Sequence, residues 1–346
     1  MKKVILTGDR PTGKLHLGHY TGSLENRVML QDNYEVYVIV ADFQVLTEHL
    51  NETELVEQSI KDLVLDYLAV GIDPSKASIF VQSRVPALTE LHMYFSMLVN
   101  LPRLKRNPTV KEELKKSGKE LTYGFLGYPI SQAADILAFN ADLVPVGEDQ
   151  VAHVEQTREI ARSFNNLFGE VFNIPEPLVG KAKRLPGIDG DKMSKSRGNA
   201  IYLSDSPEVV RKKISKAFTD PKRIRANDHG NPDGCVIFQY YQYFSEEGEV
   251  KNIENKCRKG QMGCVECKSC ITNIINDFLA PIQKRRSEFE NKPDLVSQII
   301  MEGTAKAVEK TNSVLAKARK AMYYDYASIF PEKGGKGHGN TDTCSP

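Results

Sequence analysis

The N-terminal half of the chain alternates short apolar runs with amphipathic segments. Three apolar runs rich in β-branched residues predict buried strands at Lys3–Thr7, Tyr34–Ala41 and Ala77–Gln82. A segment with helical spacing, Glu54–Val70, lies between the second and third of these runs. Strands that alternate with helices are typical of βαβ units, so we expect an α/β fold with a Rossmann-type parallel sheet.

The pattern changes after Asn199, where few strands are expected. Three long segments there have helical spacing: Pro207–Ala217, Glu266–Arg286 and Pro293–Ala321. We therefore predict a first domain at residues 1–198 and a mostly α-helical second domain at residues 199–330. The Gly-rich, polar tail at residues 331–346 is predicted to be disordered.

Composition narrows the class of protein. The 346 residues carry a net charge of +1, so any binding of nucleic acid would use local basic clusters rather than a global field. Such clusters occur at residues 181–184, 211–216 and 222–225. The first strand follows Met1 almost directly, which argues against a signal peptide, and no apolar stretch is long enough to span a membrane. We expect a soluble cytoplasmic protein.

The first segment with candidate chemistry follows the first strand. A turn-rich loop at Gly8–Gly13 leads into His16-Leu17-Gly18-His19 at the start of a helix that we expect to run through Met29. A strand, a glycine-bearing loop and a helix start together form an anion site. Imidazole N–H groups of His16 and His19 can donate to phosphate oxygens, and Gly18 lets a flat base or ribose approach the backbone.

The second segment is Lys192-Met193-Ser194-Lys195-Ser196, which follows a glycine-rich stretch. Its two lysines are flexible point charges suited to phosphate oxygens. A loop of this kind can close over a bound nucleotide and supply charge mainly in the transition state.

In this order, the two motifs resemble the signature sequences of the class I aminoacyl-tRNA synthetases. Tyr128–Leu137 is similar to the specificity helix of the tryptophanyl branch, and Val146–Gln150 with His153 is similar to its second nucleotide loop. The resemblance extends from Lys3 to about Tyr326. It implies a bacterial-type enzyme that activates L-tryptophan with ATP and transfers it to tRNA(Trp), with an anticodon-binding domain after residue 198.

The resemblance also implies roles for individual residues, together with Mg²⁺ as a cofactor and a homodimeric state. The implied catalytic residues are His16, His19, Lys192 and Lys195. The implied ATP-binding residues are Arg10, Pro11, Thr12, Gly18, His19, Gly147, Glu148, Asp149, Leu185, Lys192, Met193, Ser194, Lys195 and Ser196.

Asp135 is the candidate for recognising the amino acid. Its apolar neighbours predict partial burial, so its carboxylate needs a partner. A carboxylate only accepts and an indole N–H only donates, which suits tryptophan. A tyrosine hydroxyl could also donate to Asp135. The glutamine at position 132, Gln132, resembles the tyrosyl enzymes, whereas many tryptophanyl enzymes have Met at that place. A tyrosine–tRNA ligase is therefore the alternative.

Five of the six cysteines are clustered, in the spacing Cys235-x21-Cys257-x6-Cys264-x2-Cys267-x2-Cys270. Such clustering in a cytosolic chain indicates a metal site rather than disulfides, and four thiolates suit both zinc and an iron–sulfur cluster. The spacing resembles a sub-branch of tryptophanyl enzymes that carries a [4Fe–4S] cluster, which implies Cys235, Cys257, Cys264 and Cys267 as ligands and Cys270 as an extra candidate. A non-catalytic, metal-stabilised RNA-binding paralogue is a further alternative, although both signature loops are intact.

Overall fold

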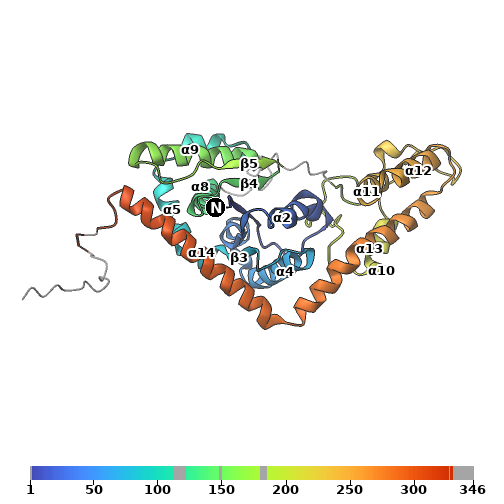
Figure 1. Cartoon of the computed structure of the whole chain (residues 1–346). Coiled ribbons are helices and arrows are strands. Elements are labelled where there is room, and N and C mark those ends of the chain that lie inside the picture. Colours follow the sequence, from blue (N-terminus) through green and yellow to red (C-terminus); the bar gives the residue numbers. More distant parts are fainter. Residues whose placement is uncertain (1, 112–121, 148–149, 180–184, 327, 330–346) are drawn as a thin grey trace, which may run out of the picture.

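The computed structural model describes residues 2–111, 122–147, 150–179, 185–326 and 328–329. Its centre is a sheet of five parallel strands in the order β3-β2-β1-β4-β5 (Figure 1). The strands are β1 Val4–Asp9, β2 Glu35–Val40, β3 Ala77–Val81, β4 Leu143–Val146 and β5 Glu176–Val179. The predicted α/β fold with a parallel sheet is confirmed.

β2 and β3 lie within the apolar runs that predicted them, and β1 overlaps its run but continues to Asp9. Strands covered on both faces need apolar side chains at nearly every position. β4 and β5 were not predicted. Each has four residues and contains a proline, Pro145 or Pro177, which lacks a backbone donor and weakens the strand signal. β1 and β4 pair only through Ile5 and Leu143, at the point where the strand order reverses.

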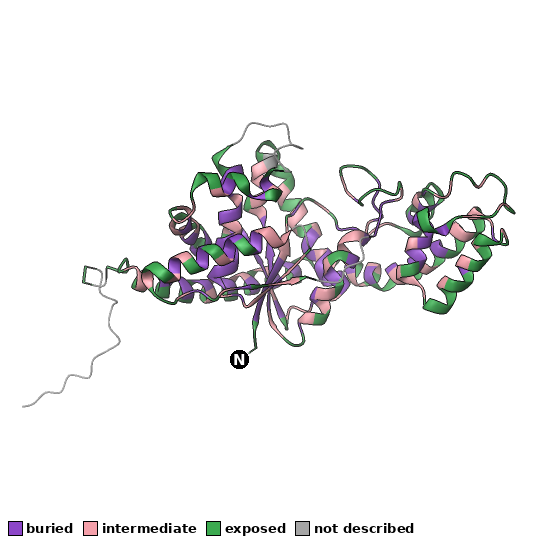
Figure 2. Cartoon of the chain, turned by 90° about the horizontal axis from the view of Figure 1, so that it is seen from above, coloured by how far each residue is buried: buried purple, intermediate pink, exposed green. Residues whose placement is uncertain are grey.

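Successive side chains of each strand point to opposite faces of the sheet and pack into two separate hydrophobic cores. Ile5 and Val38 pack with α4 (Glu54–Val70) on one face, whereas Leu6 and Ile39 pack with the helices of the other face. Those helices are α5 (Pro86–Ser96), α8 (Tyr123–Ala138) and α9 (Val151–Phe168). Figure 2 shows the purple, buried strands between these helical layers. The bounds predicted for α4 are confirmed.

The helix predicted after the His16–His19 motif is interrupted. It consists of α1 (Leu17–His19), a π-helical turn η1 (Tyr20–Leu24) and α2 (Glu25–Leu30). Single π-helical turns frequently mark functional sites, because the extra residue re-aims the side chains that precede it.

The chain beyond residue 199 is mostly helical, as predicted. It contains α10 (Pro207–Ser215), the short turn η5 (Pro232–Gly234), α11 (Val236–Phe244), α12 (Glu247–Arg258), α13 (Cys264–Glu290) and α14 (Pro293–Ala321). In Figure 1, α13 runs from α10 and α11 towards α4, and α14 returns along β3 and α5. The domain boundaries predicted at residues 198 and 330 stay predictions. The tail at residues 331–346 lies outside the described residues.

Shorter helices connect these elements: α3 (Asp42–His49), η2 (Leu50–Glu52), η3 (Gln82–Arg84) and α6 (Leu101–Arg106). Asn107, just after α6, is fully buried, and its side chain finds a partner in Gln156, to which it donates at 2.8 Å. None of the helices in the described parts of the chain is both long and apolar enough to cross a membrane.

The close approach of α14 to the edge of the sheet yields a stability prediction. A Cβ added at Gly303 would lie 2.0 Å from the carbonyl oxygen of Ile79 in β3. Gly303→Ala should therefore lower the free energy of unfolding by roughly 1–3 kcal/mol, the usual cost of overpacking. The matched control is Gly248→Ala on exposed α12, where a Cβ meets nothing within 4 Å. Denaturant unfolding that shows equal stability for the two variants would contradict the prediction.

Candidate active site

A cavity of about 740 Å³ lies at the carboxyl ends of β1 and β4. Asp9 and Arg10 line it after β1, and Gly147 lines it after β4. Tyr128 and Asp135 of α8 contribute a further part of its wall. This is the position at which open α/β sheets bind ligands, and the volume suits a nucleotide or an amino acid.

An ion pair between buried Arg27 and partly buried Asp9 supports the loop after β1. Arg27 of α2 lies 2.5 Å from one oxygen of Asp9 and 3.2 Å from the other, and the Tyr67 hydroxyl donates to Asp9 at 2.8 Å. Burial opposes ionisation of Asp9, but the charge and hydrogen bonds of Arg27 outweigh it and hold the pKa well below its usual value. The sequence analysis missed this pair, although an arginine on the buried side of a short helix is a usable signal.

The two histidine rings of the first motif contact each other, with centroids 3.7 Å apart and planes tilted by 43°. Burial lowers the pKa of His16 to about 3 and that of His19 to about 4, with nearby lysine charges adding to both shifts. Both rings are therefore neutral at pH 7. The backbone N–H of His16 donates to Nδ1 of His19 at 3.2 Å, so the His19 proton belongs on Nε2, where it can donate to a ligand.

The two signature loops contact each other, although they are 175 positions apart. The Gly18 N–H lies 3.3 Å from the Met193 sulfur. Lys195 Nζ donates to the Thr12 hydroxyl at 3.1 Å and to the Gly13 carbonyl at 2.8 Å. The structure thus brings a lysine of the second motif to the loop that leads into the first.

Asn199 organises the loop that carries Lys192 and Lys195. Its side-chain oxygen accepts from the Ser194 N–H at 2.8 Å, while its amide donates to the Lys192 carbonyl at 3.1 Å and to Asp189 at 2.8 Å. Asn199 is 2% exposed, so these bonds are shielded from water. The sequence analysis gave this residue no role, because its partners become apparent only once the loop is folded.

Asp135 is buried, as predicted, and lies on the wall of the cavity. Gln82 Nε2 donates to both of its oxygens, at 2.9 and 2.8 Å, and the Gln82 oxygen in turn accepts from the Phe43 N–H at 3.1 Å. Burial raises the pKa of Asp135 to about 7; the bonds from Gln82 oppose this rise and the negative charge of Asp42 adds to it. The carboxyl group is thus held in place by a neutral partner that leaves its charge uncompensated.

A buried polar network lies beside Asp135. The Tyr128 hydroxyl is 3.2 Å from Nε2 of His153, and Nδ1 of that ring is 3.3 Å from the Asn107 amide. Asn107 also donates to Gln156, which fixes the orientation of its amide. The network fixes the Tyr128 side chain at the cavity.

The predicted ATP-binding residues fall into three groups. Arg10 and Gly147 line the cavity. Glu148 and Asp149 lie outside the described residues. The others are not among its lining residues: Pro11, Thr12, Gly18, His19, Leu185, Lys192, Met193, Ser194, Lys195 and Ser196. Leu185 and Met193 are buried in the core between the two loops, whereas Lys192 and Ser196 are exposed.

The four cysteines predicted as ligands line one small cavity of about 20 Å³ between α11, α12 and α13; they are Cys235, Cys257, Cys264 and Cys267. Cys270 is exposed and is not a lining residue. The Arg223 guanidinium lies 3.9 Å from the sulfurs of both Cys257 and Cys264. Among the described residues, no group of three or more His, Cys, Asp or Glu has the arrangement of a metal site.

Comparison with known proteins agrees with this geometry. A family model described as tRNA synthetases class I (W and Y) matches residues 2–280. The tryptophan–tRNA ligase of Streptococcus mutans is 48% identical over 94% of this chain and 99% of the relative. The Lactococcus lactis ligase of the same name is 46% identical over the same shares.

Solved structures show the same likeness. The tryptophanyl-tRNA synthetase of Campylobacter jejuni, complexed with ADP and tryptophan, has a TM-score of 0.84 and 31% identity, and the alignment covers 92% of this chain and 99% of that one. The tyrosyl-tRNA synthetase of Archaeoglobus fulgidus, at 22% identity and a TM-score of 0.64, shares the fold. The family match over most of the chain, together with these identities, shows that the chain belongs to the class I tRNA synthetases of the tryptophan and tyrosine family.

Proposed function

We propose that the protein is a tryptophan–tRNA ligase. The observation that carries the proposal is one cavity with both signature loops joined near one side and a buried, acceptor-only carboxylate, Asp135, on its wall. The names of the relatives that match nearly the whole chain support tryptophan as the amino acid. A cytoplasmic location, where tRNA charging takes place, goes with this proposal.

The proposed reaction has two steps. A carboxylate oxygen of tryptophan attacks the α-phosphorus of ATP; a new P–O bond forms, the bond to the β-phosphate bridge breaks and pyrophosphate leaves. A terminal ribose hydroxyl of tRNA(Trp) then attacks the acyl carbonyl, and AMP leaves. Neither step needs a side-chain nucleophile, so the protein contributes position and charge stabilisation.

The residues divide this work. His19 donates through Nε2 without carrying charge, and the loop lysines supply positive charge to the phosphates. Asn199 and the contact between Gly18 and Met193 hold the loop near its target. Mg²⁺ bound with ATP would neutralise phosphate charge while keeping most of its own waters.

The experiment that tests the proposed function is amino-acid-dependent exchange of pyrophosphate into ATP, run separately with tryptophan and tyrosine. We expect exchange with tryptophan only. Exchange with tyrosine alone would make the chain a tyrosine–tRNA ligase. A folded protein that supports exchange with neither would favour the non-catalytic RNA-binding paralogue.

We predict that Lys195→Ala lowers kcat of adenylate formation by roughly two to three orders of magnitude, the scale of one lost transition-state contact. Lys195 donates hydrogen bonds to Thr12 and Gly13, in the loop that precedes the helix of the first motif. The matched control is Arg197→Ala, an exposed cation of the same loop that pairs with Asp191. An unchanged kcat with only a raised KM for ATP would refute this role.

We predict that Asp135→Asn lowers kcat/KM for tryptophan while KM for ATP changes little. The amide keeps an acceptor but loses the charge-assisted bond and introduces a donor towards the indole. Steady-state exchange kinetics measure both constants. Unaffected tryptophan kinetics would make Asp135 a structural residue.

The raised pKa of Asp135 gives this prediction a pH dependence. A donor binds the carboxylate more tightly than the protonated acid, so tryptophan binding lowers the pKa from its free value of about 7. Tryptophan affinity should therefore rise as the pH increases from about 6 to 8, and the rise should vanish in Asp135→Asn. Asp42→Asn removes a nearby negative charge and should move the transition to lower pH.

We further propose that Cys235, Cys257, Cys264 and Cys267 hold a [4Fe–4S] cluster of structural role, with zinc as the alternative. The donor set fits such a group, because four cysteine sulfurs border a single cavity. Without a cation, burial raises the pKa of Cys267 to about 12, and neighbouring sulfurs add to the rise. Thiolate ligands would need a metal charge to offset this cost.

We predict that Cys264→Ser loses iron and acid-labile sulfide, and impairs tRNA charging more than tryptophan-dependent exchange. Cys270→Ser is the matched control, because its thiol is exposed and lies outside the cavity, so this variant should keep its iron. Metal and sulfide analysis of anaerobically purified protein decides the assignment. Stoichiometric zinc without sulfide would replace iron, and absence of any metal would refute the site.

Two more features belong to the proposal. The domain at residues 199–330 binds the anticodon of tRNA(Trp), and the boundaries at residues 198 and 330 stay part of this proposal. The active form is a homodimer, as the resemblance implies. Three apolar side chains spaced four apart, Met93, Met97 and Leu101, are 55%, 70% and 56% exposed and support an interface at α5 and α6.

A further inference from the structure

We propose that Arg286 and Gln283 of α13 are positioning residues for adenylate formation, because together they hold both signature loops from a single helix. The inference rests on the proposed function. The two side chains are three positions apart and therefore lie on one face of α13. Arg286 is connected through Asp66 to the segment that contains the first motif. Gln283 contacts Asp205 in the segment that follows the second motif.

The first contact runs through Asp66 of α4. One Asp66 oxygen accepts from the backbone N–H of Leu15 at 2.6 Å, directly before His16. The Arg286 guanidinium donates to the other Asp66 oxygen and lies 2.7 Å from Asp62. Asp66 is 0% exposed and Arg286 is 4% exposed, so this connection is shielded from water. Burial raises the pKa of Asp66 to about 6 although the Arg286 charge opposes the rise.

The second contact runs through Asp205. The Gln283 amide donates to the Asp205 carbonyl at 2.8 Å. The Asp205 carboxylate accepts from the Tyr202 N–H at 2.8 Å and from Lys213 at 2.6 Å. Gln283 therefore holds the turn that fixes Tyr202, a few residues after the second motif.

These two segments also pair with each other. The Leu17 N–H donates to the Ile201 carbonyl at 2.9 Å, and the Leu203 N–H donates to the Leu15 carbonyl at 3.0 Å. His16 and Tyr202 lie opposite each other in this antiparallel bridge. The backbone of Leu15 is thus bonded on both sides: its N–H to Asp66, and its carbonyl to Leu203.

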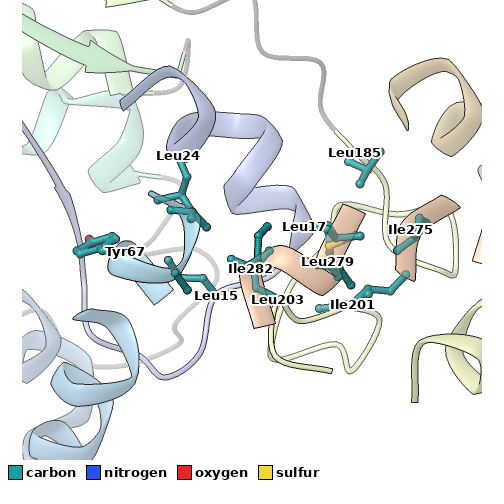
Figure 3. Close-up of a cluster of buried hydrophobic side chains, with 14 of the residues drawn as sticks. Leu15, Leu17, Leu24, Tyr67, Leu185, Ile201, Leu203, Ile275, Leu279 and Ile282 are labelled. Atoms are coloured by element: carbon teal, nitrogen blue, oxygen red, sulfur yellow. The ribbon is translucent and has the colours of Figure 1, made fainter. Parts of the chain in front are cut away.

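Apolar packing completes the arrangement. Figure 3 shows Leu15 and Leu17 with Ile201 and Leu203, beside Leu279 and Ile282 of α13. Since close-packed side chains transmit small shifts, a displacement of α13 would move both loops together. The same helix begins at Cys264 in the cysteine cavity, so the helix that carries these contacts also reaches the proposed metal site.

The test is Arg286→Lys, which keeps the charge but loses the planar fork that spans Asp62 and Asp66. We expect kcat of tryptophan-dependent exchange to fall about 10- to 100-fold, because small misplacements of reacting groups have effects of this size. KM for tryptophan should change less than about threefold, since Asp135 is untouched. Gln283→Leu, which removes one donor, should lower kcat in the same direction and decides the matter if Arg286→Lys does not fold.

The matched control is Arg319→Lys. Arg319 of α14 makes a forked pair with Glu90 of α5 that is more exposed than the Arg286 pair, since the two side chains are 43% and 30% exposed. It should lower stability without lowering kcat. Amide hydrogen exchange supplies a second readout: Arg286→Lys should lose protection at residues 15–17 and 201–203, and Arg319→Lys should not.

Normal kcat in both Arg286→Lys and Gln283→Leu would overturn the inference. Equal losses of kcat in Arg286→Lys and Arg319→Lys would overturn it too, because they would reflect stability alone. The proposed function fails in a different way, when the wild-type protein shows no tryptophan-dependent exchange. The hydrogen-exchange readout still reports on the contact between α13 and the two loops in that case.

Discussion

The short antiparallel pairing between residues 15–17 and 201–203 is the interaction on which the active site depends. It joins two loops that are far apart in the chain, so its few hydrogen bonds must offset a large closure entropy. They do so only because the side chains on the same residues, Leu15, Leu17, Ile201 and Leu203, are fully buried against α13. The site is therefore a product of the packing between the sheet and the C-terminal helices, and not of either loop alone.

Three carboxylates show how this packing sets pKa values: Asp66 and Asp135 are buried, and Asp9 is partly buried. Asp9 has a guanidinium on both oxygens, and its pKa lies far below the usual value. Asp66 shares Arg286 with Asp62 and has a pKa of about 6. Asp135 has the neutral partners Gln82 and Gln44, and its pKa is about 7. The strength of the charge partner follows the order of the three pKa values. Of these three acids, Asp9 and Asp135 line the cavity, and a donating ligand can therefore shift the pKa of Asp135 more than that of Asp9.

Much of this architecture could be predicted from the sequence, because local patterns of apolar residues indicate most of its strands and helices. The apolar runs gave β1 to β3, and helical spacing gave α4, α13 and α14. The second signature loop was predictable because its chemical groups lie in five adjacent residues, Lys192–Ser196. The partners of those residues were not, since Lys195 and Thr12 are 183 positions apart and no local pattern links them. β4 and β5 were missed because four-residue strands that contain proline have little periodicity to detect.

The neutral state of His16 and His19 bears on the role of the Lys192–Ser196 loop. Because burial keeps His16 and His19 uncharged at pH 7, hydrogen bonds from them to phosphate oxygens, as proposed above, would add no positive charge. The positive charge that stabilises the leaving pyrophosphate must then come from elsewhere, and Lys195 already reaches the loop before the first motif. A charge carried on a loop can strengthen its contacts as the transition state forms, whereas a fixed charge would bind substrate and transition state alike. On the proposal above, Asn199 holds this loop directly, and α13 holds the segment that follows it through Gln283 and Asp205.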